Sequence, residues 1–137
     1  MTFDEWVAEV PEEIRSDSVW RVKAYQLSLF LAGLAWRDAL QMLANRRCAE
    51  ASDQLTRATS RISANISEGY SRNTGRGRAT SYEYGLGSTR ESRDWYYHGR
   101  HGLSPDVLAH CLDLCTQIVR LLIKMISTER RTNRPIA

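Results

Sequence analysis

The sequence lacks a long uninterrupted apolar segment. No apolar run in the 137 residues approaches the roughly 18–20 residues that a membrane-spanning helix needs, because charged residues such as Arg37, Asp38 and Lys124 interrupt the longest candidates. The first 17 residues are acidic and contain Pro11, which does not fit a secretory signal peptide. We therefore expect a soluble, cytoplasmic protein.

Motifs for metal, nucleotide and redox chemistry are also missing. The three cysteines are odd in number and have no secretory context, so we interpret them as free thiols. No Glu-x-x-His repeat of the ferritin-like kind occurs, and no GxxxxGK[ST] phosphate-binding loop. His98 and His101 could join Cys111 and Cys115 around zinc, but both cysteines lie on an apolar helix face, which favours buried, inert thiols. We predict no metal site, no cofactor and no enzymatic activity.

The sequence has very little lysine, and its positive charge is unevenly distributed. Lys23 and Lys124 are the only lysines among 19 basic residues. Residues 1–17 carry a net charge of −5, and because the whole chain carries +3, the other 120 residues carry +8. Arginine suits phosphates and carboxylates, although a GC-rich genome also raises its frequency. The acidic segment is either a short helix that docks through Phe3 and Trp6 or a loosely held arm.

Apolar residues recur at helical spacing in four long segments, and no alternating strand pattern occurs. We expect helices at about residues 17–44, 51–70, 80–99 and 104–127. The sequence therefore predicts an all-α, antiparallel up-and-down four-helix bundle over residues 18–127, between an acidic arm at 1–17 and a basic tail at 128–137. The first and fourth helices are apolar on more than one face, and Gly33 allows a partner helix to approach closely. We therefore expect a homo-oligomer.

The second predicted helix carries an apolar stripe with polar side chains at its edge. Asn65 lies on this stripe, where an unpaired buried amide costs roughly 1–3 kcal/mol. It therefore either pins a neighbouring helix or contacts a ligand. We predict that Asn65, Glu68, Ser88 and Glu91 form a polar layer that fixes the register of two helices.

Arginines without intervening acids gather in residues 71–78, which we expect to be a loop. Such a loop suits a phosphate backbone, or it is an ordinary solvated connection. The candidate nucleic-acid contacts are Arg72, Arg76, Arg78, Arg100, Arg130 and Arg131. The aromatic run Trp95–His98 either stacks on exposed bases or belongs to the core or an interface.

Two stretches resemble a known protein family. Residues 57–69 read RATSRISANISEG, which is similar to the hallmark R-A-x-x-S-I-P-A-N-I-A-E-G of the proteins encoded in 23S rRNA intervening sequences, also called S23 ribosomal proteins. Residues 85–91, GLGSTRE, are similar to the A-L-G-S-x-x-E element of that family. Arg61, Ser63 and Ser67 depart from the hallmark, and the missing proline at position 63 should leave this helix straighter.

The resemblance implies a four-helix bundle that assembles into a ring, a homopentamer, without known enzymatic activity. Binding of rRNA or another nucleic acid is the usual suggestion for that family, and a related bundle is the accessory protein of a reverse transcriptase. Two functions therefore remain open. The first is an oligomeric protein that binds structured RNA or DNA through its arginine-rich surface. The second is a protein-interaction adaptor, for example an accessory subunit of a reverse transcriptase or another nucleic-acid enzyme.

Overall fold

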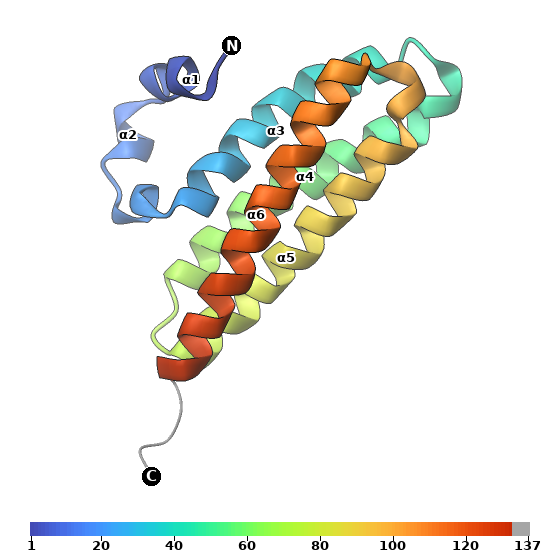
Figure 1. The fold of residues 1–137 in the computed structure, drawn as a ribbon. Coiled ribbons are helices and arrows are strands. Elements are labelled where there is room, and N and C mark those ends of the chain that lie inside the picture. Colours follow the sequence, from blue (N-terminus) through green and yellow to red (C-terminus); the bar gives the residue numbers. More distant parts are fainter. Residues whose placement is uncertain (133–137) are drawn as a thin grey trace.

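Four long helices form the body of the protein in a computed structural model that describes residues 1–132 (Figure 1). They are α3 (Lys23–Met42), α4 (Ala49–Tyr70), α5 (Gly75–His98) and α6 (Pro105–Thr132). Successive helices run antiparallel and are joined by short connections. No strand occurs in residues 1–132, and the predicted all-α four-helix bundle is confirmed.

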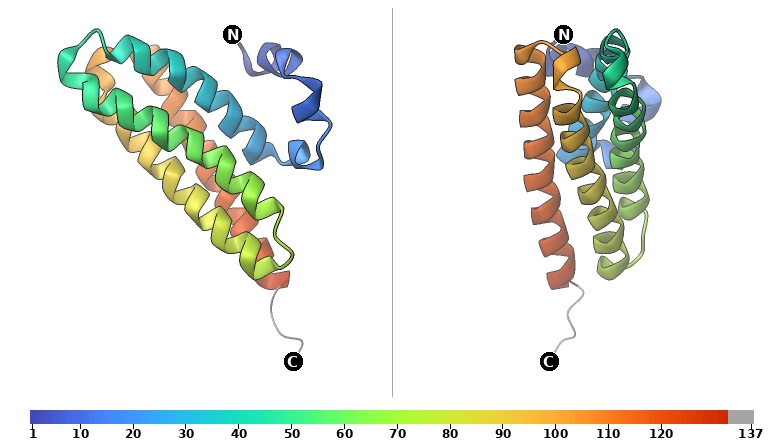
Figure 2. Two further views of the ribbon diagram at one scale, coloured as in Figure 1. Left: turned by 180° about the vertical axis from the view of Figure 1, so that it is seen from behind. Right: turned by 90° about the vertical axis from the view of Figure 1, so that its right-hand side faces the viewer.

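The helices pack most closely as consecutive pairs, whereas α3 meets α6 less extensively (Figure 2). Each long helix contributes large side chains that are fully buried, and these make one continuous core. They include Leu31 and Met42 of α3, Leu55, Ile62 and Ile66 of α4, Tyr96 of α5, and Ile118 and Leu122 of α6. No helix in the described part of the chain is long and apolar enough to cross a bilayer.

The acidic N-terminal segment docks on α3. It forms α1 (Phe3–Glu9), α2 (Glu12–Arg15) and the 3-10 helix η1 (Ser18–Arg21). The aromatic rings of Phe3 and Trp6 lie 5.5 and 5.4 Å from the ring of Phe30, measured between centroids. Burial of aromatic surface therefore holds the segment, and the docked-helix alternative is confirmed.

The first long helix begins later than predicted. Asp17 caps η1 instead of α3, because its side chain accepts a hydrogen bond from the backbone N–H of Val19 at 3.0 Å. Val22 then takes an extended conformation, and α3 starts at Lys23. The prediction of one helix from about residue 17 is therefore wrong, since the local cap closes a separate turn.

The arginine-rich stretch 71–78 is not a continuous loop. The Thr74 side chain accepts a hydrogen bond from the backbone N–H of Gly77 at 3.0 Å, which caps α5 and starts the helix at Gly75. Near the C-terminus, α6 continues through residues 128–132, which we expected to be a frayed tail. Residues 133–137 of that predicted tail lie outside the described part. The remaining connections contain the 3-10 helices η2 (Arg46–Cys48) and η3 (Arg100–Gly102).

Candidate nucleic-acid interface and self-association face

Five of the six candidate arginines gather at one end of the bundle. Arg72 follows α4, Arg76 and Arg78 lie in the first turns of α5, and Arg130 and Arg131 lie in the last turns of α6. Figure 1 shows these segments together near the last turn of α6. We call this region, residues 68–83 and 124–131, the arginine end. Because α5 starts here and α6 finishes here, helix geometry gathers the guanidinium groups without a flexible loop.

Carboxylates of α4, α5 and α6 orient three of these arginines. Arg72 pairs with Glu68 at 2.6 Å, and Arg78 pairs across the α5–α6 contact with Glu129 at 2.8 Å. Arg130 pairs with Glu83 of α5. Arg78 also donates to the backbone oxygen of Arg72 at 3.0 Å, which ties the connection to α5.

Arg76 and Arg131 have no carboxylate within 4.0 Å in residues 1–132, so their charge is not neutralised by an ion pair. Arg76 and Arg130 both line a hollow of about 220 Å³ between α5 and α6.

Arg100 lies far from the other five. It belongs to η3, beyond the last residue of α5, whereas Arg76 lies at the start of that helix. At about 1.5 Å per residue, the 24 residues of α5 place these two arginines roughly 36 Å apart. The Arg100 guanidinium stacks 4.1 Å from the centre of the exposed Tyr97 ring. The structure therefore does not unite all six candidates on one surface.

The side chains of Asn65, Glu68 and Glu91 from the predicted polar layer each form a hydrogen bond with a residue four positions away in the sequence. The Asn65 amide donates to the backbone oxygen of Arg61 at 2.8 Å, and Glu68 accepts from Arg72. On α5, Glu91 accepts from the Trp95 indole N–H at 3.2 Å. The backbone oxygen of Ser88 accepts from the Ser92 hydroxyl at 2.8 Å.

Glycines fix the α4–α5 packing where the polar layer was expected. A Cβ atom on Gly69 would lie 2.7 Å from the Tyr82 ring, too close without movement of that ring. A Cβ on Gly85 would lie 3.5 Å from the Cβ of Asn65. The final glycine of the NISEG stretch therefore allows α5 to approach α4, and Asn65 lies beside Gly85 of the neighbouring helix.

A buried polar cluster that the sequence analysis missed joins three helices. The Tyr96 hydroxyl of α5 donates to Asp38 Oδ2 of α3 at 2.8 Å. The Cys111 thiol of α6 donates to the same oxygen at 3.4 Å. We call these three residues the Asp38 cluster. One signal was available in the sequence, because Asp38 interrupts an otherwise apolar helix, but its partners are 58 and 73 residues away.

The environment keeps the buried hydroxyl and thiol groups protonated. Burial raises the pKa of the Cys111 thiol to about 12, and the nearby Asp38 carboxylate adds to this effect. Burial likewise raises the pKa of the Cys115 thiol to about 12 and raises the pKa of Tyr96 above its ordinary range. A thiol reacts and binds metal as the thiolate, so both cysteines are inert at neutral pH. In residues 1–132, no group of three or more His, Cys, Asp or Glu side chains is arranged to hold a metal ion.

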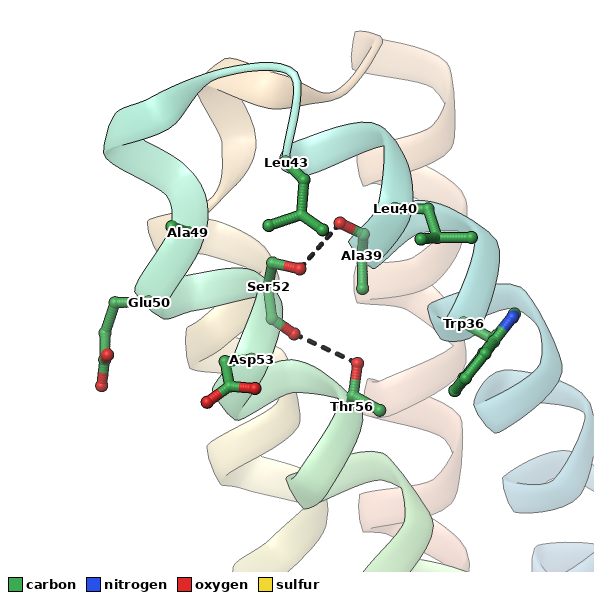
Figure 3. A pocket seen from close by; sticks show the side chains of 9 residues that line it. All are labelled: Trp36, Ala39, Leu40, Leu43, Ala49, Glu50, Ser52, Asp53 and Thr56. Atoms are coloured by element: carbon green, nitrogen blue, oxygen red, sulfur yellow. Dashed lines mark hydrogen bonds between the residues drawn. The ribbon is translucent and has the colours of Figure 1, made fainter.

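An exposed apolar stripe follows the outer face of α3. Trp36, Leu40 and Leu43 are 63%, 58% and 52% exposed, large values for such side chains. Figure 3 shows them facing the first turns of α4 across a groove, with Glu50 and Asp53 on its α4 side. The groove has a volume of about 440 Å³. The hydrogen bond from Ser52 to the backbone oxygen of Ala39, 2.7 Å long, holds the two helices together at its floor (Figure 3).

Gly33 extends the same stripe by one turn. It is exposed, and a Cβ atom added to it would meet no atom within 4 Å. Glycine inside a helix costs roughly 0.5–1 kcal/mol relative to alanine, and nothing in the described part of this chain requires it here. The stripe therefore has the small and large apolar residues that helix–helix contacts use.

Comparison with known proteins agrees with this architecture. The sequence profile of the 23S rRNA-intervening sequence protein family matches residues 21–124. A crystal structure of a protein of unknown function from the S23 ribosomal protein family of Bacteroides thetaiotaomicron is similar in fold, with a TM-score of 0.54 and 16% sequence identity. The match covers 74% of this chain and 98% of that one. No curated protein matches the sequence. Since the profile match spans most of the bundle, the chain belongs to the 23S rRNA-intervening sequence protein family.

Proposed function

We propose that the protein is a non-enzymatic, self-associating helical bundle that binds structured RNA through its arginine end. The observation that supports this proposal is the convergence of five arginines from three segments on one end of the molecule. The segments at the arginine end carry six basic residues and three carboxylates, a net charge of +3. An oriented cluster of guanidinium groups suits the closely spaced phosphates of a folded nucleic acid.

The ion pairs at the arginine end are compatible with phosphate binding. The Arg72, Glu68, Arg130 and Glu83 side chains are all at least 46% exposed, so water or a phosphate can reach them. Exposed pairs of this kind contribute only about 0–1 kcal/mol to stability. Their carboxylates therefore orient the guanidinium groups, and a phosphate can replace these carboxylates with little loss of stability.

Salt-dependent binding of an RNA hairpin tests the proposal. Affinity, measured by fluorescence anisotropy, should fall steeply between about 50 and 200 mM salt, because bound phosphates release counterions. The double variant Arg76→Ala/Arg131→Ala should weaken binding and lower the slope of log K against log salt by about two. Neither residue takes part in an ion pair within residues 1–132, so the fold should be unaffected.

Arg100→Ala is the control, because it removes a positive charge from the other end of the bundle. Its affinity should stay near that of the unchanged protein. Absence of binding at the lowest salt concentration, or an equal loss in Arg100→Ala, would contradict an interface at the arginine end.

Self-association through the α3 stripe is the second part of the proposal. Trp36, Leu40 and Leu43 need cover from water, and a second copy of the chain supplies it. The family resemblance suggests a homopentameric ring, which would multiply the positive charge and give weak phosphate contacts avidity. Native mass spectrometry should detect an oligomer, and Leu40→Asp should shift it towards monomer.

A pair of glycine variants tests the same contact more finely. Gly33 and Gly87 are both exposed helical glycines, and a Cβ atom added to either would meet no atom within 4 Å. Replacement of either by alanine should stabilise its helix, by roughly 0.5–1 kcal/mol. Only Gly33→Ala should also weaken association, because the new methyl group lies in the α3 contact. Equal association in both variants would remove Gly33 from the interface.

A protein-interaction adaptor is the second candidate function, and the groove beside the α3 stripe favours it. Its apolar side chains and its Glu50 and Asp53 rim suit a basic, amphipathic helix of another protein, such as a nucleic-acid polymerase. A pull-down that retains one protein after nuclease treatment would support this function. That protein should be lost from Leu40→Asp, and a capture that survives this substitution would contradict a site in the groove.

A further inference from the structure

A second cavity opens on another side of the arginine end. It lies among the first turn of α3, the last residue of α4, the start of α5 and the last turns of α6. With 20 residues against 28, α3 is eight residues shorter than α6, or about 12 Å. The α3 helix therefore leaves part of α6 uncovered, and a hollow of about 580 Å³ remains.

The wall of this cavity combines apolar and cationic side chains. Val22, Ala24, Leu121 and Met125 provide apolar surface from α3 and α6 and from the residue before α3. Its basic residues are Lys23, Arg78 and Lys124. Both lysines of the chain therefore line one cavity, although they are 101 positions apart in the sequence.

The positive charge of the cavity is only partly neutralised. Glu129 lines it and pairs with Arg78 at 2.8 Å, while Lys23 lies 4.2 Å from the centre of the Phe3 ring. Neither lysine has a carboxylate within 4.0 Å in the described part of the chain. Three cations against one carboxylate favour an anionic ligand.

Tyr82 adds a hydroxyl group at the wall of the cavity. Its side chain is only 3% exposed, yet within residues 1–132 its hydroxyl takes part in no hydrogen bond with another residue. Every fully buried side-chain polar atom in that part of the chain has a hydrogen-bond partner, so the unpartnered Tyr82 oxygen is not fully buried. Tyr82 lines the cavity. Burial, followed by the charge of Glu129, raises the pKa of Tyr82, so the hydroxyl stays protonated and available as a donor. Such a donor gains from an acceptor that enters with a ligand.

We propose that this cavity binds a small carboxylate with an apolar body, such as a medium-chain fatty acid or an aromatic acid. The carboxylate accepts hydrogen bonds from Lys124 and the Tyr82 hydroxyl, and the apolar body covers Leu121 and Met125. Cavities of roughly 300–1,000 Å³ hold ligands of this size. The apolar wall distinguishes this cavity from the exposed guanidinium groups of the arginine end, which suit the phosphates of a polymer.

Isothermal titration calorimetry with decanoate and with 2-naphthoate tests the proposal, at concentrations below micelle formation. Each probe should bind saturably to the full chain with a stoichiometry of one per subunit. Acetate supplies the charge without the apolar body, and 1-decanol supplies the body without the charge, so both should bind much more weakly. Binding of only one carboxylate probe would also support the proposal and would identify the shape of the apolar body. Failure of both, or equally strong binding of 1-decanol, would overturn it.

Substitutions in the cavity distinguish binding at this site from non-specific binding to the protein surface. Lys124→Met keeps an unbranched side chain but removes the charge, and it should raise the Kd by about tenfold or more, as for the loss of a hydrogen bond to a charged group. Tyr82→Phe removes only the hydroxyl and should raise the Kd by about threefold to tenfold. Unchanged affinity in both variants would overturn the assignment.

Two controls make the outcome independent of RNA binding. Arg120→Met removes a cation one helical turn before Lys124 and outside the cavity, and it should leave the Kd unchanged. Arg76→Ala/Arg131→Ala, the variant expected to lose RNA, should also bind decanoate normally. An equal loss in Arg120→Met would show general electrostatic attraction and would contradict a built site.

Discussion

The two ends of the bundle are both built from helix ends, but they differ in net charge and in the burial of their polar contacts. At the arginine end, exposed carboxylates orient guanidinium groups, and the net charge is +3. The opposite end, residues 38–50 and 96–111, carries three arginines and three carboxylates and has no net charge. There, Gly99 and Gly102 pack against Met42, and the Asp38 cluster ties α3, α5 and α6 together.

We expect the two ends to contribute differently to stability and to binding. Buried hydrogen bonds and close glycine contacts contribute to stability because water cannot replace them. Exposed ion pairs contribute little to stability but keep charge accessible to a partner. We therefore expect substitutions at the opposite end to change folding, and substitutions at the arginine end to change binding.

The largest expected effect is that of Gly102→Val. Even a Cβ atom at this position would lie 3.0 Å from the Met42 Cα, so a branched side chain forces η3 away from the end of α3. The free energy of unfolding should fall by about 1–3 kcal/mol, measured by urea denaturation. Gly87→Ala, on an open helix surface, is the control and should not destabilise the protein. A normal urea midpoint for Gly102→Val would contradict tight packing at this end.

Tyr96→Phe should have the next largest effect. It removes the hydroxyl that donates to Asp38 and leaves a buried carboxylate oxygen with only the weaker thiol donor. A loss of about 1–3 kcal/mol in unfolding free energy is expected, again from urea denaturation. Tyr97→Phe, at an exposed neighbouring position, should be nearly neutral. Equal stability of the two variants would remove the energetic role of the Asp38 cluster.

Alkaline pH should lower the stability of the fold through the two buried thiols of α6. The pKa values of Cys111 and Cys115 are about 12 in the folded chain and about 9 in the unfolded chain. Above pH 9 the unfolded state loses these protons while the folded state keeps them, so stability should fall as pH rises from 9 towards 12. Thermal melts across this range measure the effect. The fall should be smaller in Cys111→Ala, and an equal fall would assign it to other groups.

Glu83→Gln should have the smallest effect on stability and the opposite effect on binding. It removes the carboxylate that competes with phosphate for Arg130. Because this pair is exposed, unfolding free energy should change by less than about 1 kcal/mol. RNA affinity at low salt should rise, measured by anisotropy. A fall in affinity would mean that orientation by Glu83 matters more than competition.

Much of the fold could be predicted from local pattern. The ends of α4 and α5 fell close to Gly69 and Gly99, and Ser104-Pro105 marked the start of α6 correctly. The start of α5 could not be predicted in the same way. Two glycines between residues 75 and 78 suggested a loop, but the Thr74 cap and the Arg78–Glu129 pair make this segment helical.

The candidate sites were harder to predict because they depend on which helix ends meet. Arg100 and Arg76 were grouped as candidates by charge alone, although the helix predicted over 80–99 already places them at opposite ends of the bundle. The Asp38 cluster draws one residue from each of three helices, and the two lysines line one cavity although they belong to the first and last of the four long helices. Tertiary packing decides which residues of different helices come together, and local periodicity does not reveal this.

The docked N-terminal segment has a consequence for how the molecule meets a polyanion. The segment lies along one flank of the bundle (Figure 1). Its aromatic rings contact Phe30 of α3, and Asp4, Glu5 and Glu12 are exposed to water. If the protein binds RNA as proposed, that flank should repel an approaching phosphate chain while the arginine end attracts it. We therefore expect the uneven charge to orient the bundle relative to such a partner before the first contact forms.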